Sequence, residues 1–149
     1  MTEAIIMDFD NFDQRVLQVM RNKPDWFLEV ENVASDEDII KIESKLCSNL
    51  PVQFKHFSKN FGAGYFGMSI ISSIREESEF YILRRPDITV EGRKMLIVSD
   101  DQSGGYFGFL SKGDQISNEI FYVAPDDGGY HELFAECFFD YIDKNVIPV

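Results

Sequence analysis

Residues 50–64, LPVQFKHFSKNFGAG, decide the fold, because they hold a complete helix and the turn that leads out of it. Pro51 is expected at the first helical position, where its missing N–H costs nothing. Gly62 suits the left-handed conformation in which many helices end. The apolar face of this helix recurs at helical spacing and consists of Phe54, Phe57 and Phe61. The context predicts that a helix precedes the glycines and a strand follows them.

Two further helices are predicted on the N-terminal side of this stretch. The first ends near Asn22, because Pro24 cannot continue it. Its apolar face is Phe12, Val16, Val19 and Met20. The second begins at Ser35, a good N-cap, and the three acids at 36–38 complement the helix dipole. Its buried face is Ile39, Ile42 and Leu46.

On the C-terminal side the hydrophobic pattern becomes typical of strands. Five runs are predicted as strands: residues 68–74, 79–84, 94–99, 105–111 and 118–124. In the fourth run Phe107 and Phe109 should face one side of the sheet, while Tyr106 and Leu110 face the other. Glycine-containing turns separate the later runs.

A last helix is predicted from Glu132 to Asn145, with an apolar stripe of Phe134, Phe138, Tyr141 and Ile142. Helices at both ends of a run of strands indicate an α+β fold. We expect a mostly antiparallel central sheet of about five to six strands, flanked by N-terminal helices and one C-terminal helix. The length of 149 residues fits one domain.

The charge of the chain limits its partners. Its 26 acids and 14 Lys and Arg give a net charge of −12. Residues 1–38 carry ten acids and three bases, residues 39–99 six and nine, and residues 100–149 ten and two. Such a surface repels nucleic acid and anionic membranes and attracts basic partners. The alternative is that the charge only keeps the protein soluble.

The sequence offers no convincing catalytic or metal site. Residues 62–67, GAGYFG, match the dinucleotide fingerprint, and Asp87 lies where a ribose-binding acid would be. The fingerprint needs a strand before it and a helix after it, however, and here the order is reversed. His56 and His131 lack the partners of a zinc helix. We therefore expect no enzymatic activity, no nucleotide, no metal and no other cofactor.

Other features bear on the compartment in which the protein acts. The N-terminus lacks the basic start of a secretory signal, and no apolar run is long enough to span a membrane. Cys47 and Cys137 have no metal-like spacing and are expected to be free thiols. We expect a cytoplasmic protein that is a monomer or a weak dimer.

The order of these patterns resembles the SUKH superfamily. The likeness is carried first by Ser35-x-x-Asp38-Ile39 and Leu50-Pro51-x-x-Phe54-Lys55-x-Phe57 with the glycines that follow. Further on, Ile97-Val98-Ser99-Asp100, Tyr106-Phe107-Gly108-Phe109 and the closing helix are similar to the family's central strand pair and last helix. The likeness spans about residues 30–145. We therefore expect a single SUKH-like domain over residues 1–149, with residues 1–30 as a helical extension outside the family pattern.

The resemblance implies a binding protein without catalytic residues. Many bacterial members neutralise a toxin, often a nuclease, by binding it, and the yeast members regulate cell-wall synthesis. Three functions are weighed: an immunity protein that binds a basic toxin, a regulatory adaptor that recruits cellular partners, and an enzyme whose pair of acids the sequence does not locate. The first is the expected function and the adaptor is its alternative. The acids at strand ends beside glycines are the predicted partner-binding residues, because such side chains point to solvent. They are Asp100, Asp101, Asp126 and Asp127.

Overall fold

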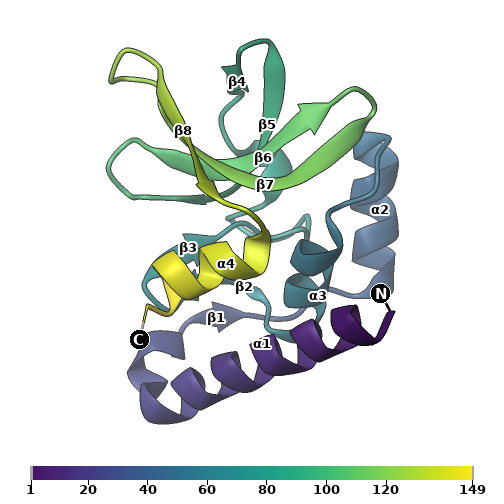
Figure 1. The fold of residues 1–149 in the computed structure, drawn as a ribbon, viewed down its shortest axis with the longest axis vertical. Helices are drawn as coiled ribbons and strands as arrows, with labels where there is room; N and C mark the ends of the chain where they lie inside the picture. Colours follow the sequence, from purple (N-terminus) through teal and green to yellow (C-terminus); the bar gives the residue numbers. More distant parts are fainter. Residues whose placement is uncertain (1, 149) are drawn as a thin grey trace.

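The computed structural model describes the backbone of residues 2–148 and the side chains of residues 9–148. The helices are α1 (Thr2–Asn22), η1 (Pro24–Phe27), α2 (Asp36–Leu46), α3 (Val52–Asn60), η2 (Ile82–Arg84), α4 (Phe138–Tyr141) and the π-turn η3 (Ile142–Val146). The strands are β1 (Val30–Glu31), β2 (Ala63–Phe66), β3 (Ser69–Ile71), β4 (Thr89–Val90), β5 (Arg93–Asp100), β6 (Tyr106–Lys112), β7 (Gln115–Ala124) and β8 (Tyr130–Ala135). The α+β class is confirmed (Figure 1).

All eight strands belong to one sheet, and every pair of named strands in it is antiparallel. The order is β1-β2-β3-β5-β6-β7-β8, and β4 pairs with the start of β5. This is more than the five to six strands expected. The difference comes from β8, which was predicted as helix, and from short strands such as β1 and β4, whose two residues are too few to show an alternating pattern.

The predicted helix starts and stops are largely confirmed. Ser35 caps α2 in a reciprocal capping box: its Oγ accepts from the Asp38 amide at 3.1 Å, and Asp38 accepts from the Ser35 amide at 2.8 Å. Pro51 is the residue before α3 and not its first residue. Gly62 has a φ of 100°, so it takes the left-handed conformation that was predicted to end this helix.

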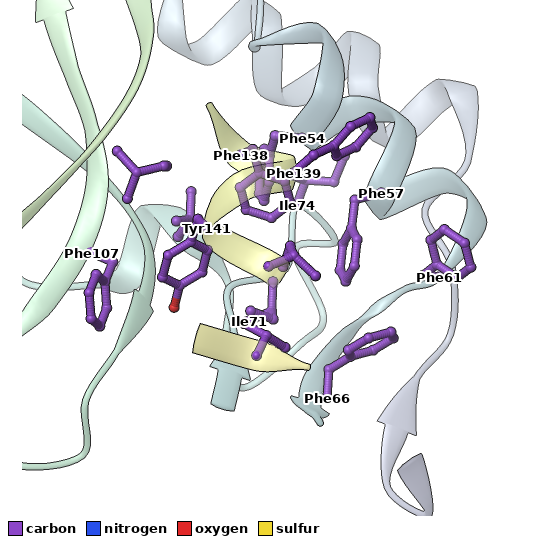
Figure 2. Close-up of a cluster of buried hydrophobic side chains, with 14 of the residues drawn as sticks. Phe54, Phe57, Phe61, Phe66, Ile71, Ile74, Phe107, Phe138, Phe139 and Tyr141 are labelled. Carbon is purple, nitrogen blue, oxygen red and sulfur yellow. The ribbon is translucent and has the colours of Figure 1, made fainter. Parts of the chain in front are cut away.

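The core is a layer of aromatic rings between the helices and the sheet (Figure 2). The short helix α4 lies in its centre and contacts elements on both sides. Phe139 stacks on Phe12 of α1 at 3.8 Å between ring centroids, Phe138 lies 5.1 Å from Phe54 of α3, and Tyr141 lies 5.0 Å from Phe107 of β6. Because one cluster joins α1, α3, β6 and α4, the N-terminal helix is packed into the same core as the sheet.

The two faces of the sheet are both apolar near its centre. Phe107 and Phe109 belong to the main core, whereas Leu110 and Tyr106 belong to a smaller cluster on the opposite face, around Val90 and Met95. The predicted alternation along β6 is thus confirmed.

The prediction for the C-terminal helix is wrong over its first six residues, 132–137. Residues from Tyr130 to Ala135 form β8, and the helix begins only at Phe138. These residues pair with β7 from Ile120 to Ala124, so the strand ladder decides their conformation. Phe134 still reaches Tyr141 at 5.9 Å and Phe107 at 4.8 Å, because the inward face of a strand satisfies the same apolar requirement as a helix stripe.

The prediction of a strand over residues 79–84 is also wrong. This segment is a turn followed by η2, with one isolated bridge between Ser73 and Tyr81. Arg84 holds the turn by donating to the carbonyls of Glu76 and Ser78. Tyr81 and Ile82 are buried, so their apolar run reflects core packing without a ladder. The predicted strand 68–74 is shortened to β3.

Candidate partner-binding surface

The turn between β5 and β6 is organised by one carboxylate. Asp101 Oδ1 accepts from the amides of Ser103 and Gly105, both at 2.7 Å, and its Oδ2 accepts from the Tyr122 hydroxyl of β7 at 2.7 Å. A Cβ at position 105 would overlap both the Tyr122 hydroxyl and Asp101, so glycine leaves room for the hydrogen bond between these two side chains. These bonds tie the turn to the neighbouring β7.

The same contacts shift the ionisation of both partners. Partial burial acts to raise the pKa of Asp101, but the bonds from Tyr122, Gly105 and Ser103 outweigh it and hold the pKa below the usual 3.8. The bond to Asp101, together with desolvation and the charges of Asp127 and Glu132, raises the pKa of Tyr122 to about 12. The negative charges of Asp127 and Glu132 oppose ionisation of the Tyr122 hydroxyl, and Glu132 lies opposite Tyr122 in the β7–β8 pairing.

Replacing Asp101 with Asn is expected to destabilise the fold by about 1–2 kcal/mol at neutral pH, because it weakens charge-assisted hydrogen bonds at a partly exposed site. The folded pKa of Asp101 lies below its unfolded value, so this stabilisation is present above about pH 4 and is lost as the pH falls through the folded pKa. The gap between wild type and variant should narrow in acid.

Urea unfolding at pH 7 and at pH 3 measures this difference. Asp126→Asn is the matched control, since this exposed carboxylate has no hydrogen-bond partner within residues 9–148, and its effect should stay within about 0.5 kcal/mol. An Asp101→Asn variant with wild-type stability at both pH values would contradict the structural role.

Asp100 is likewise engaged within the fold. Its Oδ2 is 3.1 Å from Nη1 of Arg85, with both side chains less than a fifth exposed, and its Oδ1 accepts from the Gln102 amide at 2.8 Å. Arg85 also donates to Ser72 at 3.1 Å. The expectation that strand-end acids point freely to solvent is therefore wrong for Asp100 and Asp101.

Asp126 and Asp127 behave as that expectation describes. Both are exposed in the turn between β7 and β8, and the structure records no ion pair for either among the side chains that it describes. A Cβ at Gly104 would lie 3.9 Å from Asp126 Oδ2, so the β5–β6 and β7–β8 turns adjoin. Three of the four predicted acids thus meet at this end of the sheet: Asp101, Asp126 and Asp127.

Strand β8 adds residues that the sequence did not single out as partner-binding. Tyr130 is 48% and Leu133 46% exposed, and the Tyr130 hydroxyl donates to Glu132 at 2.8 Å. The predicted helix included Glu132 and Leu133, which concealed a hairpin strand after the Asp126-Asp127-Gly128-Gly129 turn. We call Asp101, Asp126, Asp127, Tyr130 and Glu132 the acidic turn patch.

The described part of the chain contains no group of three or more His, Cys, Asp or Glu placed to hold a metal ion, and no helix there is long and apolar enough to cross a membrane. Both cysteines are free, as predicted; Cys47 is exposed and Cys137 is partly buried. Of the glycines in residues 62–67, Gly62 lies in the helix-to-strand turn, Gly64 in β2 and Gly67 in the turn between β2 and β3. A Cβ at Gly62 would overlap the Glu31 carbonyl, and one at Gly67 would overlap the Val146 carbonyl. Close backbone packing accounts for these two positions.

A model of a known protein family matches most of the chain. Residues 36–142, more than half of the chain, match the model of the SUKH_6 family, described as SMI1-KNR4 cell-wall. The chain belongs to the SUKH superfamily. The SUKH match begins at the first residue of α2 and ends within the C-terminal helix, so it contains the acidic turn patch and leaves out α1 and β1. No curated protein and no solved structure matches the chain.

Proposed function

We propose that this SUKH protein is a non-catalytic immunity protein, which binds and neutralises a basic toxin domain, a nuclease, in the cytoplasm. The observation that supports the proposal best is the acidic turn patch. It places the exposed carboxylates of Asp126, Asp127 and Glu132 on the β7–β8 hairpin, beside the partly buried Asp101 of the adjoining β5–β6 turn, within the segment that matches the family. A nuclease must be basic around its active site to hold phosphates, so an acidic protein can cover that site and exclude the substrate.

The organisation of the patch suits rapid recognition. Asp101 is fixed by three hydrogen bonds, and Glu132 is held by Tyr130, so part of the charge is already ordered before a partner arrives. Tyr130 offers an exposed aromatic ring beside these charges, which is the kind of side chain that contributes most to binding energy at interfaces. Charge attraction would raise the rate of association, and the ring would slow dissociation.

The second candidate is a regulatory adaptor. It is favoured by the description of the matching family model, SMI1-KNR4 cell-wall, which names the cell wall. An adaptor would use the same kind of acidic surface to recruit a cellular protein.

A growth experiment distinguishes the immunity function from the adaptor function. An immunity gene lies beside the gene of its toxin, so the C-terminal domain encoded immediately upstream is expressed alone and together with this chain. We expect expression of the domain alone to stop growth and coexpression to restore it by about a thousandfold in colony count, because a tightly bound nuclease is inactive. An unrelated upstream gene, or growth arrest that coexpression does not relieve, would contradict the immunity function and favour the adaptor.

A further inference from the structure

Strand β8 forms one border of the sheet, and its outer edge is open. It pairs with β7 on one side, from Tyr130 opposite Ala124 to Ala135 opposite Ile120. Within the described residues no strand pairs with its other side. The opposite border of the sheet is β1, which is only two residues long. β4, which pairs only with β5, is an edge strand of two residues as well, so β8 is the longest edge strand of the sheet. An unpaired strand edge leaves a row of backbone donors and acceptors facing outward.

This edge has few of the features by which proteins block strand addition. Residues 130–135, YHELFA, contain no Pro and no Lys, although Glu132 adds one charge. The register of the ladder shifts only at its far end, between Ile120 and Phe121. Near the same end of β8, Lys144 donates to the carbonyl of Phe134 at 2.6 Å, so this one backbone acceptor is already bonded. From Tyr130 to Leu133 the side chains are exposed and the strand is accessible.

A hollow of about 310 Å³ lies where β8 meets α4. Leu133, Phe134 and Ala135 supply its apolar lining. Three carboxylates and one ammonium complete it: Glu136, Asp140, Asp143 and Lys144, whose Nζ already donates to the Phe134 carbonyl. Asp143 is paired with Arg15 at 2.8 Å, whereas Glu136 and Asp140 have no cationic partner within the described side chains. Lys144 is the one cation among the residues that line the hollow, and it bonds to a backbone carbonyl and not to either of these carboxylates. Apolar walls with two unpaired carboxylates fit the stem and the charged head of a further Lys or Arg side chain.

We propose that the open edge of β8 receives an extended basic segment of the toxin as an added strand, with a Lys or Arg side chain in the hollow beside α4. This inference rests on the proposed function and names its mode of recognition. Main-chain hydrogen bonds to an edge strand provide affinity, and pockets for alternate side chains provide specificity. Charge selects the occupant: the edge lies between the acidic turn patch and the carboxylates of the hollow, so a second copy of this −12 chain would be repelled.

A direct test uses a defined strand as the probe. The peptide Lys-Val-Thr-Val-Lys-Val-Thr-Val-Lys is titrated into the isotope-labelled full chain and followed by NMR, next to the peptide in which every Lys is Glu. We expect shifts confined to residues 130–144 and binding of the Lys peptide at least about tenfold tighter than that of the Glu peptide. Fully N-methylated Lys peptide, which keeps the charges but lacks amide donors, should lose this binding. Equal binding of the methylated peptide, or shifts centred elsewhere, would overturn the added strand.

Variants separate this mode from the proposed function itself. The double variant Glu136→Lys/Asp140→Lys should weaken binding of both the Lys peptide and the upstream toxin domain by about tenfold or more. The control is Asp25→Lys/Glu29→Lys, which makes the same charge change at two exposed acids in and after η1, next to the opposite border of the sheet. This control should weaken binding by less than about threefold. Full protection and unchanged affinity in the Glu136→Lys/Asp140→Lys variant would overturn the inference and leave the immunity function standing. Binding of the peptide at β8 without protection from the toxin would contradict the immunity function alone.

Discussion

Reversing Asp126, Asp127 and Glu132 to Lys is expected to slow association with the basic toxin domain by about 10- to 100-fold at low ionic strength. The three reversals change the net charge from −12 to about −6, and they place the positive charges where the toxin is proposed to dock. The difference should shrink as salt is added, because the Debye length falls to about 8 Å at physiological ionic strength. Stopped-flow association over a salt series measures both effects.

The matched control reverses Asp25, Glu29 and Glu79, three exposed acids outside the patch that give the same net charge. If both triple variants associate equally slowly, overall charge explains the effect and the patch has no special role. Asp100 and Asp101 are left unchanged, because their reversal would break the Arg85 ion pair and the Tyr122 hydrogen bond. A loss of binding in such variants would report misfolding and not a lost contact.

Phe57→Ala is expected to destabilise the fold by about 3–5 kcal/mol, the usual cost of deleting a buried Phe ring. Its side chain has no exposed surface, and its ring lies 4.8 Å from that of Phe66 and 5.4 Å from that of Phe138. The deletion would leave a cavity at the point where α3, β2 and α4 meet (Figure 2). Urea unfolding measures the loss, and it is a large fraction of the stability of a typical domain.

Two further variants keep this prediction testable if Phe57→Ala does not fold. Phe57→Leu keeps most of the buried volume and should lose less than the Ala variant. Leu28→Ala removes an apolar side chain that is 77% exposed, and it should change stability by less than about 0.5 kcal/mol. A Phe57→Ala protein with near-wild-type stability would mean that the aromatic layer does not hold the helices to the sheet.

Local sequence patterns were sufficient to predict an element where its conformation depends on residues close together in the chain. Ser35 and Asp38 form a capping box three residues apart, and Gly62 ends α3 in a left-handed conformation, so neighbouring residues satisfy these requirements. The alternation of Phe107 and Leu110 between two faces follows from the period of a strand. The resemblance to the SUKH superfamily depended on the same local patterns, and the match of residues 36–142 to the SUKH_6 family model confirms it.

Other features depended on contacts between distant segments. Residues 130–135 suit a helix by their apolar spacing, but pairing with β7 makes them a strand and creates an open edge. Residues 79–84 suit a strand, yet they form a turn and η2, and the Arg84 side chain bonds back to the carbonyls of Glu76 and Ser78. Asp100 and Asp126 look alike in the sequence as acids at strand ends, and only the position of Arg85 separates a partly buried ion pair from an exposed charge.

The sequence by itself determined the α+β class, the N-terminal helices, the central strands and the acidic character of the C-terminal third, because hydrophobic period, capping residues and charge are properties of neighbouring residues. Tertiary structure decided which acids remain available, where β8 begins and which border of the sheet stays open. Those features depend on what the chain places next to Asp101, Asp126 and β8, and hydrogen bonds between segments far apart in the sequence leave no local periodicity from which they could be predicted.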